Sequence, residues 1–122
     1  MVIFLDTYAI IEIDKGSLNY KEFSLESIKA ITTAYNLVEV HFYYLKNYGE
    51  KEANLIYDIV KDLVVKIDDS IVKEANIFKI KSLKKRLSFA DCIGYLAALK
   101  YKAKFLTGDY QFKGMENVEF VR

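Results

Sequence analysis

Four acidic residues occupy corresponding places along the chain, and their carboxylates could bind a divalent cation together. Asp6 ends the first apolar run, and Asp109 follows a later apolar run, AKFL. Glu39 and Asp91 each lie three residues after a polar residue that could begin a helix. In an open parallel sheet, ligands bind at the edge formed by the carboxyl ends of the strands, where the outgoing helices also begin. We therefore expect all four acids at one edge of a sheet.

Carboxylates gathered at one edge repel one another, and some take up protons unless a cation lies among them. Hard oxygen ligands in this number suit Mg²⁺ or Mn²⁺, which keep several waters and bind substrate phosphates. Such an ion lowers the pKa of a bound water and stabilises the charge that grows on a phosphodiester. The acids therefore predict metal-dependent hydrolysis of a phosphodiester, in which Asp91 could orient the water.

The elements that must position these acids are predicted by alternating apolar runs and helical periodicity. The expected strands are residues 2–5, 28–33, 63–67, 103–106 and 118–121. The expected helices are residues 8–14, 36–48, 50–61, 69–80 and 88–101. Strands that alternate with helices of about three turns predict a parallel sheet covered on both faces. We expect one α/β domain over residues 1–122, a three-layer α/β/α fold whose mainly parallel central sheet has four to five strands.

Composition excludes several other classes of protein. The chain has 122 residues, is 52% hydrophobic and carries a net charge of +1, so any surface that binds nucleic acid must be local. A single cysteine, Cys92, excludes an internal disulfide framework and fits a reducing compartment. The sequence shows neither a signal peptide nor an apolar run of membrane-spanning length, and we expect a cytoplasmic protein.

Four segments resemble the motifs of the PIN-domain ribonucleases, and in particular those of the VapC-type toxins of toxin–antitoxin pairs. They are VIFLDT, NLVEV, LSFADCIGYLAA and FLTGDYQF, in the order and spacing of the family and over essentially the whole chain. The resemblance implies that Asp6, Glu39, Asp91 and Asp109 are the acidic quartet that binds Mg²⁺ or Mn²⁺ for RNA cleavage. It also implies that two hydroxyl residues support them, Thr7 after the first acid and Thr107 two residues before the last.

The same resemblance implies an RNA substrate, a small antitoxin protein that covers the acidic pocket, and a homodimer. Phe42, Tyr43 and Tyr57 lie off the expected core faces and are compatible with such protein surfaces. A basic segment supplies possible contacts to RNA phosphates, or else is a solvated helix end: Lys81, Lys84, Lys85 and Arg86.

Other interpretations of these residues stay open at this point. Glu39 and Asp91 could each complete a capping box, the former with Asn36 and the latter with Ser88. A receiver-like module that binds Mg²⁺ and phosphate would depend instead on Asp68, after the expected third strand. A PIN domain could also act mainly in RNA processing, or by binding RNA or a partner protein. His41 and Cys92 are interpreted as packed structural residues.

Overall fold

The computed structural model describes residues 1–122 and contains one sheet. Its strands are β1 (Val2–Leu5), β2 (Lys29–Ile31), β3 (Lys104–Thr107) and β4 (Val118–Phe120). Its α-helices are α1 (Thr7–Asp14), α2 (Ala34–Tyr48), α3 (Glu50–Val60), α4 (Asp69–Lys81) and α5 (Phe89–Lys100). Short 3₁₀ helices are η1 (Leu18–Phe23), η2 (Lys61–Leu63) and η3 (Tyr110–Phe112).

All four strands run parallel, in the order β2-β1-β3-β4. The first strand of the chain therefore lies inside the sheet, where it pairs with both β2 and β3. Its residues after Val2 are fully buried, as a continuous apolar strand in an all-parallel sheet requires. Because the strands are parallel, their carboxyl ends meet at one edge, and this edge carries Asp6, Thr107 and Asp109.

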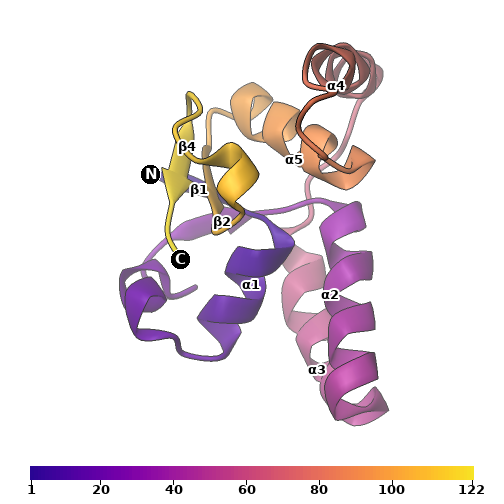
Figure 1. Ribbon diagram of the computed structural model, residues 1–122. Coiled ribbons are helices and arrows are strands. Elements are labelled where there is room, and N and C mark those ends of the chain that lie inside the picture. Colours follow the sequence, from indigo (N-terminus) through magenta and orange to yellow (C-terminus); the bar gives the residue numbers. More distant parts are fainter.

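The side chains of the sheet alternate between two cores, which makes the fold three-layered as predicted. Ile3, Leu5 and Leu106 pack with α1, α2 and α3 on one face. Phe4 and Phe105 pack with α4 and α5 on the other. Figure 1 shows these two groups of helices on opposite sides of the sheet. The predicted α/β/α class with a parallel sheet of four to five strands is confirmed, with four strands.

Helix α5 can lie close to the sheet because it faces the sheet with small residues. Gly94, Ala97 and Ala98 are all buried. A Cβ added at Gly94 would come within 3.1 Å of the Phe4 ring, and that ring is itself stacked on Phe105, with 5.4 Å between the centroids. This close approach fixes the start of α5, and with it Asp91, relative to the carboxyl end of β1.

Two predicted elements differ from the structure. Residues 63–67 were expected to form a strand, but Val64 makes only an isolated parallel bridge to Thr32. β2 ends at Ile31, and the chain turns into α2 only two residues later, so the edge of the sheet offers almost nothing to pair with. In addition, α2 begins at Ala34 rather than at residue 36, because the Thr33 side chain accepts a hydrogen bond from the Asn36 N–H.

None of the helices is both long enough and apolar enough to cross a membrane.

Candidate active site

The pairing of β1 with β3 places two of the predicted acids side by side. Leu5 pairs with Leu106, so Asp6 and Thr107 come next to each other at the carboxyl edge, and Asp109 follows two residues later. The Thr107 hydroxyl donates a hydrogen bond to Oδ2 of Asp6. The same hydroxyl oxygen accepts the N–H of Asp109 at 3.0 Å. Thr107 therefore links the first and last acids through its hydroxyl group.

Asp6 is the most deeply buried of the acids, with 7% of its surface exposed. It is also the N-cap of α1, where Oδ1 accepts the N–H of Ala9 at 2.8 Å. Burial, and to a smaller extent the nearby charges of Asp91 and Asp109, raises the pKa of Asp6 to about 7, and the hydrogen bonds from Thr107 and Ala9 oppose this rise. A cation bound beside Asp6 would offset the negative charge and so favour the ionised form of this buried carboxyl group.

Asp91 is held by the capping box that the sequence predicts at the start of α5. Oδ2 of Asp91 accepts the Ser88 N–H at 2.9 Å, and the Ser88 hydroxyl accepts the Asp91 N–H at 3.0 Å. Burial is the main cause of a raised pKa at Asp91, and the charge of Asp109 adds to it. Asp91 is therefore a capping residue and a member of the acidic set at once.

Glu39 reaches the same edge from the second turn of α2, not from its first turn as expected, since α2 begins five residues earlier. It is not a capping-box partner of Asn36, which instead lies at the third position of the helix. The Thr7 hydroxyl donates to Oε1 of Glu39 at 2.5 Å. Nδ2 of Asn36 donates to the Thr7 oxygen at 3.2 Å. Asn36 is thus a supporting residue that the sequence reasoning missed, because its side chain was assigned to a helix cap.

All four acids line one open pocket with a volume of about 370 Å³. The other residues of its lining are Thr7, Tyr8, Tyr110 and Arg122. The last three are not among the site residues predicted from the sequence. Arg122 had a usable signal, because it follows a strand parallel to β3 and so reaches the same edge of the sheet. Tyr8 and Tyr110 directly follow Thr7 and Asp109, and this proximity is the only signal in the sequence that could have indicated them.

The oxygen ligands of this pocket are of the type that a divalent cation prefers, but their side chains do not point toward a common ion position. The pocket offers carboxylate and hydroxyl oxygens and a raised pKa at Asp6, which are the marks of an uncompensated anionic site. However, no three acidic, histidine or cysteine side chains converge closely enough to hold one ion. Each acid is bonded to the chain itself, as Asp109 is to the Gln111 N–H at 2.9 Å. Joint coordination requires rotation of exposed or half-buried carboxylates such as Glu39 and Asp91.

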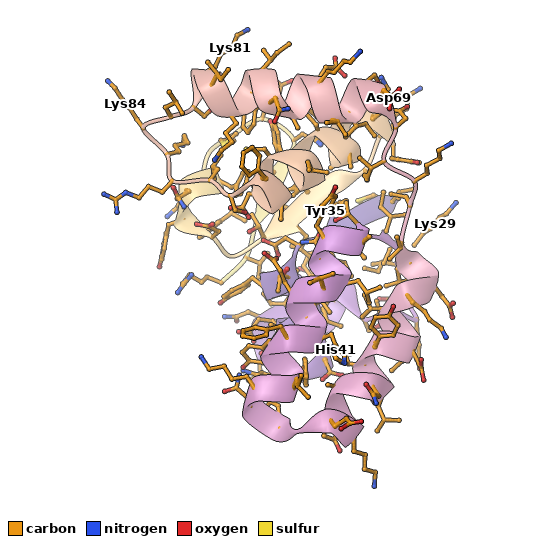
Figure 2. The ribbon with its side chains drawn as sticks, turned by 90° about the vertical axis from the view of Figure 1, so that its right-hand side faces the viewer. Lys29, Tyr35, His41, Asp69, Lys81 and Lys84 are labelled. Carbon is orange, nitrogen blue, oxygen red and sulfur yellow. The ribbon has the colours of Figure 1, made fainter.

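The basic segment that begins with the last residue of α4 divides into two parts. Nζ of Lys85 donates to the Gln111 carbonyl at 2.8 Å, and the Gln111 side chain accepts the N–H of Arg86. These bonds hold the segment against η3, directly after Asp109. Lys81 and Lys84 instead point away from the molecule into solvent (Figure 2). None of these four residues lines the acidic pocket itself.

The residues weighed as alternatives lie elsewhere. His41 contacts α3, with Nε2 at 3.1 Å from Oδ1 of Asn54, and Cys92 is buried with a raised thiol pKa. Asp68 caps α4 by accepting the Ile71 N–H at 3.0 Å and does not line the acidic pocket. The receiver-like interpretation therefore lacks the site on which it depends.

The aromatic residues expected on protein-binding surfaces are only partly exposed. Phe42 and Tyr57 are exposed, to 63% and 40%. Tyr43 is half-buried and packs edge-on against Tyr44, so its expected exposure was wrong.

A three-layer fold with a parallel sheet, and carboxylates gathered at the edge where its strands end, define a PIN-like class of architecture. The model of the PIN domain family matches residues 3–118 of the chain. The chain belongs to the PIN domain family. A comparison with curated proteins found no match.

Solved structures share the fold at low sequence identity. One is a toxin–antitoxin complex from Klebsiella pneumoniae, with 18% identity and a TM-score of 0.73 over 96% of this chain and 95% of that chain. Another is VapC20 from Mycobacterium tuberculosis, described as a sarcin–ricin loop cleaving toxin, with 18% identity and a TM-score of 0.72 over 96% and 98%. A third is VapBC2 from Rickettsia felis bound to a promoter DNA fragment, with 17% identity and a TM-score of 0.75 over 100% of both chains. The resemblance to VapC-type toxins that the motifs indicate is therefore confirmed at the level of fold.

Proposed function

We propose that this protein is a Mg²⁺- or Mn²⁺-dependent endoribonuclease that acts as the toxin of a toxin–antitoxin pair. The observation that carries the proposal is the convergence of Asp6, Glu39, Asp91 and Asp109 on one pocket from four separate parts of the chain. Ordinary turn and capping roles explain each of these residues singly, but not their meeting at one place. Membership of the PIN domain family supports the same activity.

In this proposal the four carboxylates hold the divalent ion. When such an ion is bound, its charge lowers the pKa of a water molecule and offsets the negative charge on a phosphodiester. Thr107 favours the ionised form of Asp6 by donating a hydrogen bond to it. The Thr7 hydroxyl orients the Glu39 side chain by donating a hydrogen bond to its Oε1 atom. The capping box occupies Oδ2 of Asp91 and leaves Oδ1 free to accept a hydrogen bond from the attacking water.

The partners of this proposal are RNA, a small antitoxin and a second copy of the chain. The solved structures of the same fold include a toxin–antitoxin complex and VapBC2, which supports an antitoxin partner. Exposed apolar side chains on α2, among them Phe42 at 63% exposure, offer surface for a protein contact. The contacts of Lys85 and Arg86 with Gln111, two residues after Asp109, support a role for both in binding RNA phosphates beside the pocket.

The decisive experiment measures cleavage of a structured RNA with Mg²⁺ or Mn²⁺ and with EDTA. Asp6→Asn and Asp91→Asn should abolish cleavage while far-ultraviolet circular dichroism stays unchanged. Asp68→Asn is a matched control, because Asp68 also caps a helix but lies outside the pocket. Cleavage by Asp6→Asn at the wild-type rate, or full activity in EDTA, would overturn the proposal.

One observation favours a second candidate, a PIN domain that binds RNA or a partner protein with little catalysis. No three carboxylates of the pocket converge on a common ion position. Titration calorimetry with Mn²⁺ distinguishes the two candidates. The nuclease requires Mn²⁺ binding that Asp91→Asn weakens, whereas a binding module retains RNA binding without any dependence on metal.

A further inference from the structure

Arg122 is the only basic residue in the lining of the acidic pocket. It follows β4, an edge strand of the sheet that pairs in parallel with β3. The two ion pairs of the structure, Lys61–Asp58 and Lys100–Glu74, both lie elsewhere. The positive charge of Arg122 is therefore set beside four carboxylates without being neutralised by direct pairing with any of them.

Contacts other than ion pairs hold the Arg122 side chain in place. Nη1 donates to the Gly108 carbonyl at 2.6 Å. The guanidinium lies 4.5 Å from the ring centroid of Tyr110 and 5.4 Å from that of Tyr8. Such cation–π contacts with Arg favour a fixed orientation of the planar group.

The backbone around Arg122 is fixed as well. The Val121 N–H donates to the Thr107 carbonyl at 2.9 Å. Nδ2 of Asn19 donates to the Arg122 carbonyl at 2.8 Å, and the Tyr20 hydroxyl donates to the Val121 carbonyl at 2.5 Å. Side chain and backbone are thus tied to three different segments, which means that this arginine is ordered before any ligand binds.

An ordered arginine with one hydrogen bond keeps most of its donors available. The guanidinium has five N–H donors, and the Gly108 carbonyl takes one of them. The fork geometry of the remaining donors matches two oxygens of a phosphate. An RNA strand that approaches four carboxylates is repelled, and a fixed cation at the rim offsets part of that repulsion.

Tyr110 adds a stacking surface to this charge. Its side chain is 62% exposed although it contacts Arg122 on one side and Phe120 at 5.4 Å between centroids. It directly follows Asp109 in the chain, so its ring lies next to the acids. Single-stranded RNA is recognised by stacking of unpaired bases on aromatic and guanidinium planes.

A second open hollow continues the surface on the other side of Arg122. It has a volume of about 410 Å³, and Arg122 lines it together with Glu12, Ser17, Leu18, Asn19 and Tyr20. Arg122 therefore lines both this hollow and the acidic pocket. A strand of RNA that crosses the acids can continue over Arg122 into the hollow without leaving the surface.

We infer that Arg122 and Tyr110 form a subsite for single-stranded RNA, in which Arg122 binds a phosphate next to the scissile one and Tyr110 stacks the adjoining base. This inference rests on the proposed function. In this arrangement Arg122 positions the substrate. The RNA strand then runs over the surface from the acids toward the hollow beside η1. Duplex RNA fits it poorly, because paired bases are not free to stack on a side chain.

The test uses an uncleavable background, Asp6→Asn, and a fluorescent single-stranded RNA whose binding is followed by anisotropy at several salt concentrations. In this background Arg122→Gln should weaken binding by about tenfold and lower the salt slope by about one. Lys29→Gln is the matched control, because it removes the same charge from the start of β2, whereas the pocket lies at the carboxyl ends of the strands and does not include Lys29. It should leave both quantities unchanged.

Two further variants keep the inference testable if Arg122→Gln folds poorly. Arg122→Lys should keep the salt slope and recover part of the affinity, since the charge remains but the planar fork is lost. Tyr110→Ala should weaken binding to single strands by about tenfold, whereas Tyr110→Phe should not. In the active background, Arg122→Gln should raise KM more than it lowers kcat.

The outcomes separate this inference from the proposed nuclease function. Equal affinity and equal salt slope for Arg122→Gln and Lys29→Gln would show that Arg122 does not bind the RNA, whether or not the wild type cuts RNA. If the wild type cuts no RNA but Arg122→Gln still loses binding, the nuclease proposal fails and the subsite stands. Tighter binding of a perfect duplex than of a single strand would also overturn the inference.

Discussion

The Thr107 hydroxyl donates a hydrogen bond to the Asp6 carboxylate across 101 residues of chain. The bond exists because Leu5 and Leu106 pair in the sheet and the next residues of both strands emerge side by side. The same hydroxyl oxygen accepts the Asp109 N–H at 3.0 Å. One small buried side chain therefore positions two acids and tunes the charge of the first.

Thr107→Val should shift the pH dependence of RNA cleavage upward. The Thr107 bond lowers the pKa of Asp6, which burial raises to about 7, so its loss leaves the carboxyl protonated to a higher pH. Valine has nearly the same volume, but it leaves the Asp109 N–H without its acceptor, and we expect a stability loss of about 1–3 kcal/mol. Cleavage rates between pH 6 and pH 9 check the shift.

Thr107→Ser is the control for that change, because serine keeps the hydroxyl. Its pH profile should coincide with that of the wild type at a small cost in packing. A Thr107→Val profile that coincides with the serine profile would show that the hydroxyl does not govern Asp6.

Asp6→Asn should stabilise the protein in EDTA, and the gain should grow with pH. The folded-state pKa of Asp6, about 7, lies above the ordinary value of 3.8, so ionisation opposes folding. This penalty is absent below about pH 4, accumulates up to about pH 7 and then stays constant, at about 1.4 kcal/mol per unit of pKa shift. Melting temperatures of both proteins at pH 4.5 and pH 8 measure the difference.

Divalent metal should reverse that order of stability. An ion that binds only the folded wild type stabilises it by mass action, while Asp6→Asn gains little. A wild type that melts above Asp6→Asn in EDTA at pH 8 would contradict the raised pKa.

Gly108→Ala should disturb the pocket more than the fold. A Cβ at Gly108 would lie 2.2 Å from the Tyr8 ring, which must then swing away from its place over the glycine. Tyr8 is only half-buried, so we expect a small change in melting temperature but weaker RNA binding, because Arg122 loses both Tyr8 and its position against Gly108. A double-mutant cycle with Tyr8→Ala checks this: the two effects on binding should be markedly less than additive.

Ser88→Ala should destabilise the protein by about 1 kcal/mol, because the N-cap of α5 loses the acceptor for the Asp91 N–H. Urea denaturation measures the loss. Ser82→Ala is the comparison, since Ser82 closes α4 through its backbone N–H, and its effect should stay within about 0.5 kcal/mol. Equal stabilities of the two variants would show that the capping box contributes nothing measurable.

Features that depend on a few neighbouring residues could be predicted closely. The Ser88–Asp91 capping box and the strand that precedes Asp109 follow from local spacing, and both lie where expected. The third strand could not be predicted in the same way. Residues 63–67 have the apolar pattern of a strand, but pairing needs a partner edge, and β2 is too short to provide one.

By itself the sequence determined most of the helices and strands and the positions of Asp6, Asp91 and Asp109 relative to the ends of their own elements, because both depend on local periodicity and capping. Only the tertiary structure decided that Tyr8, Tyr110 and Arg122 share the pocket and that Asp6 is buried deeply enough to raise its pKa. It also decided that Glu39 reaches the site from the second turn of its helix. Burial and the meeting of distant charges arise from long-range packing, which no local spacing records.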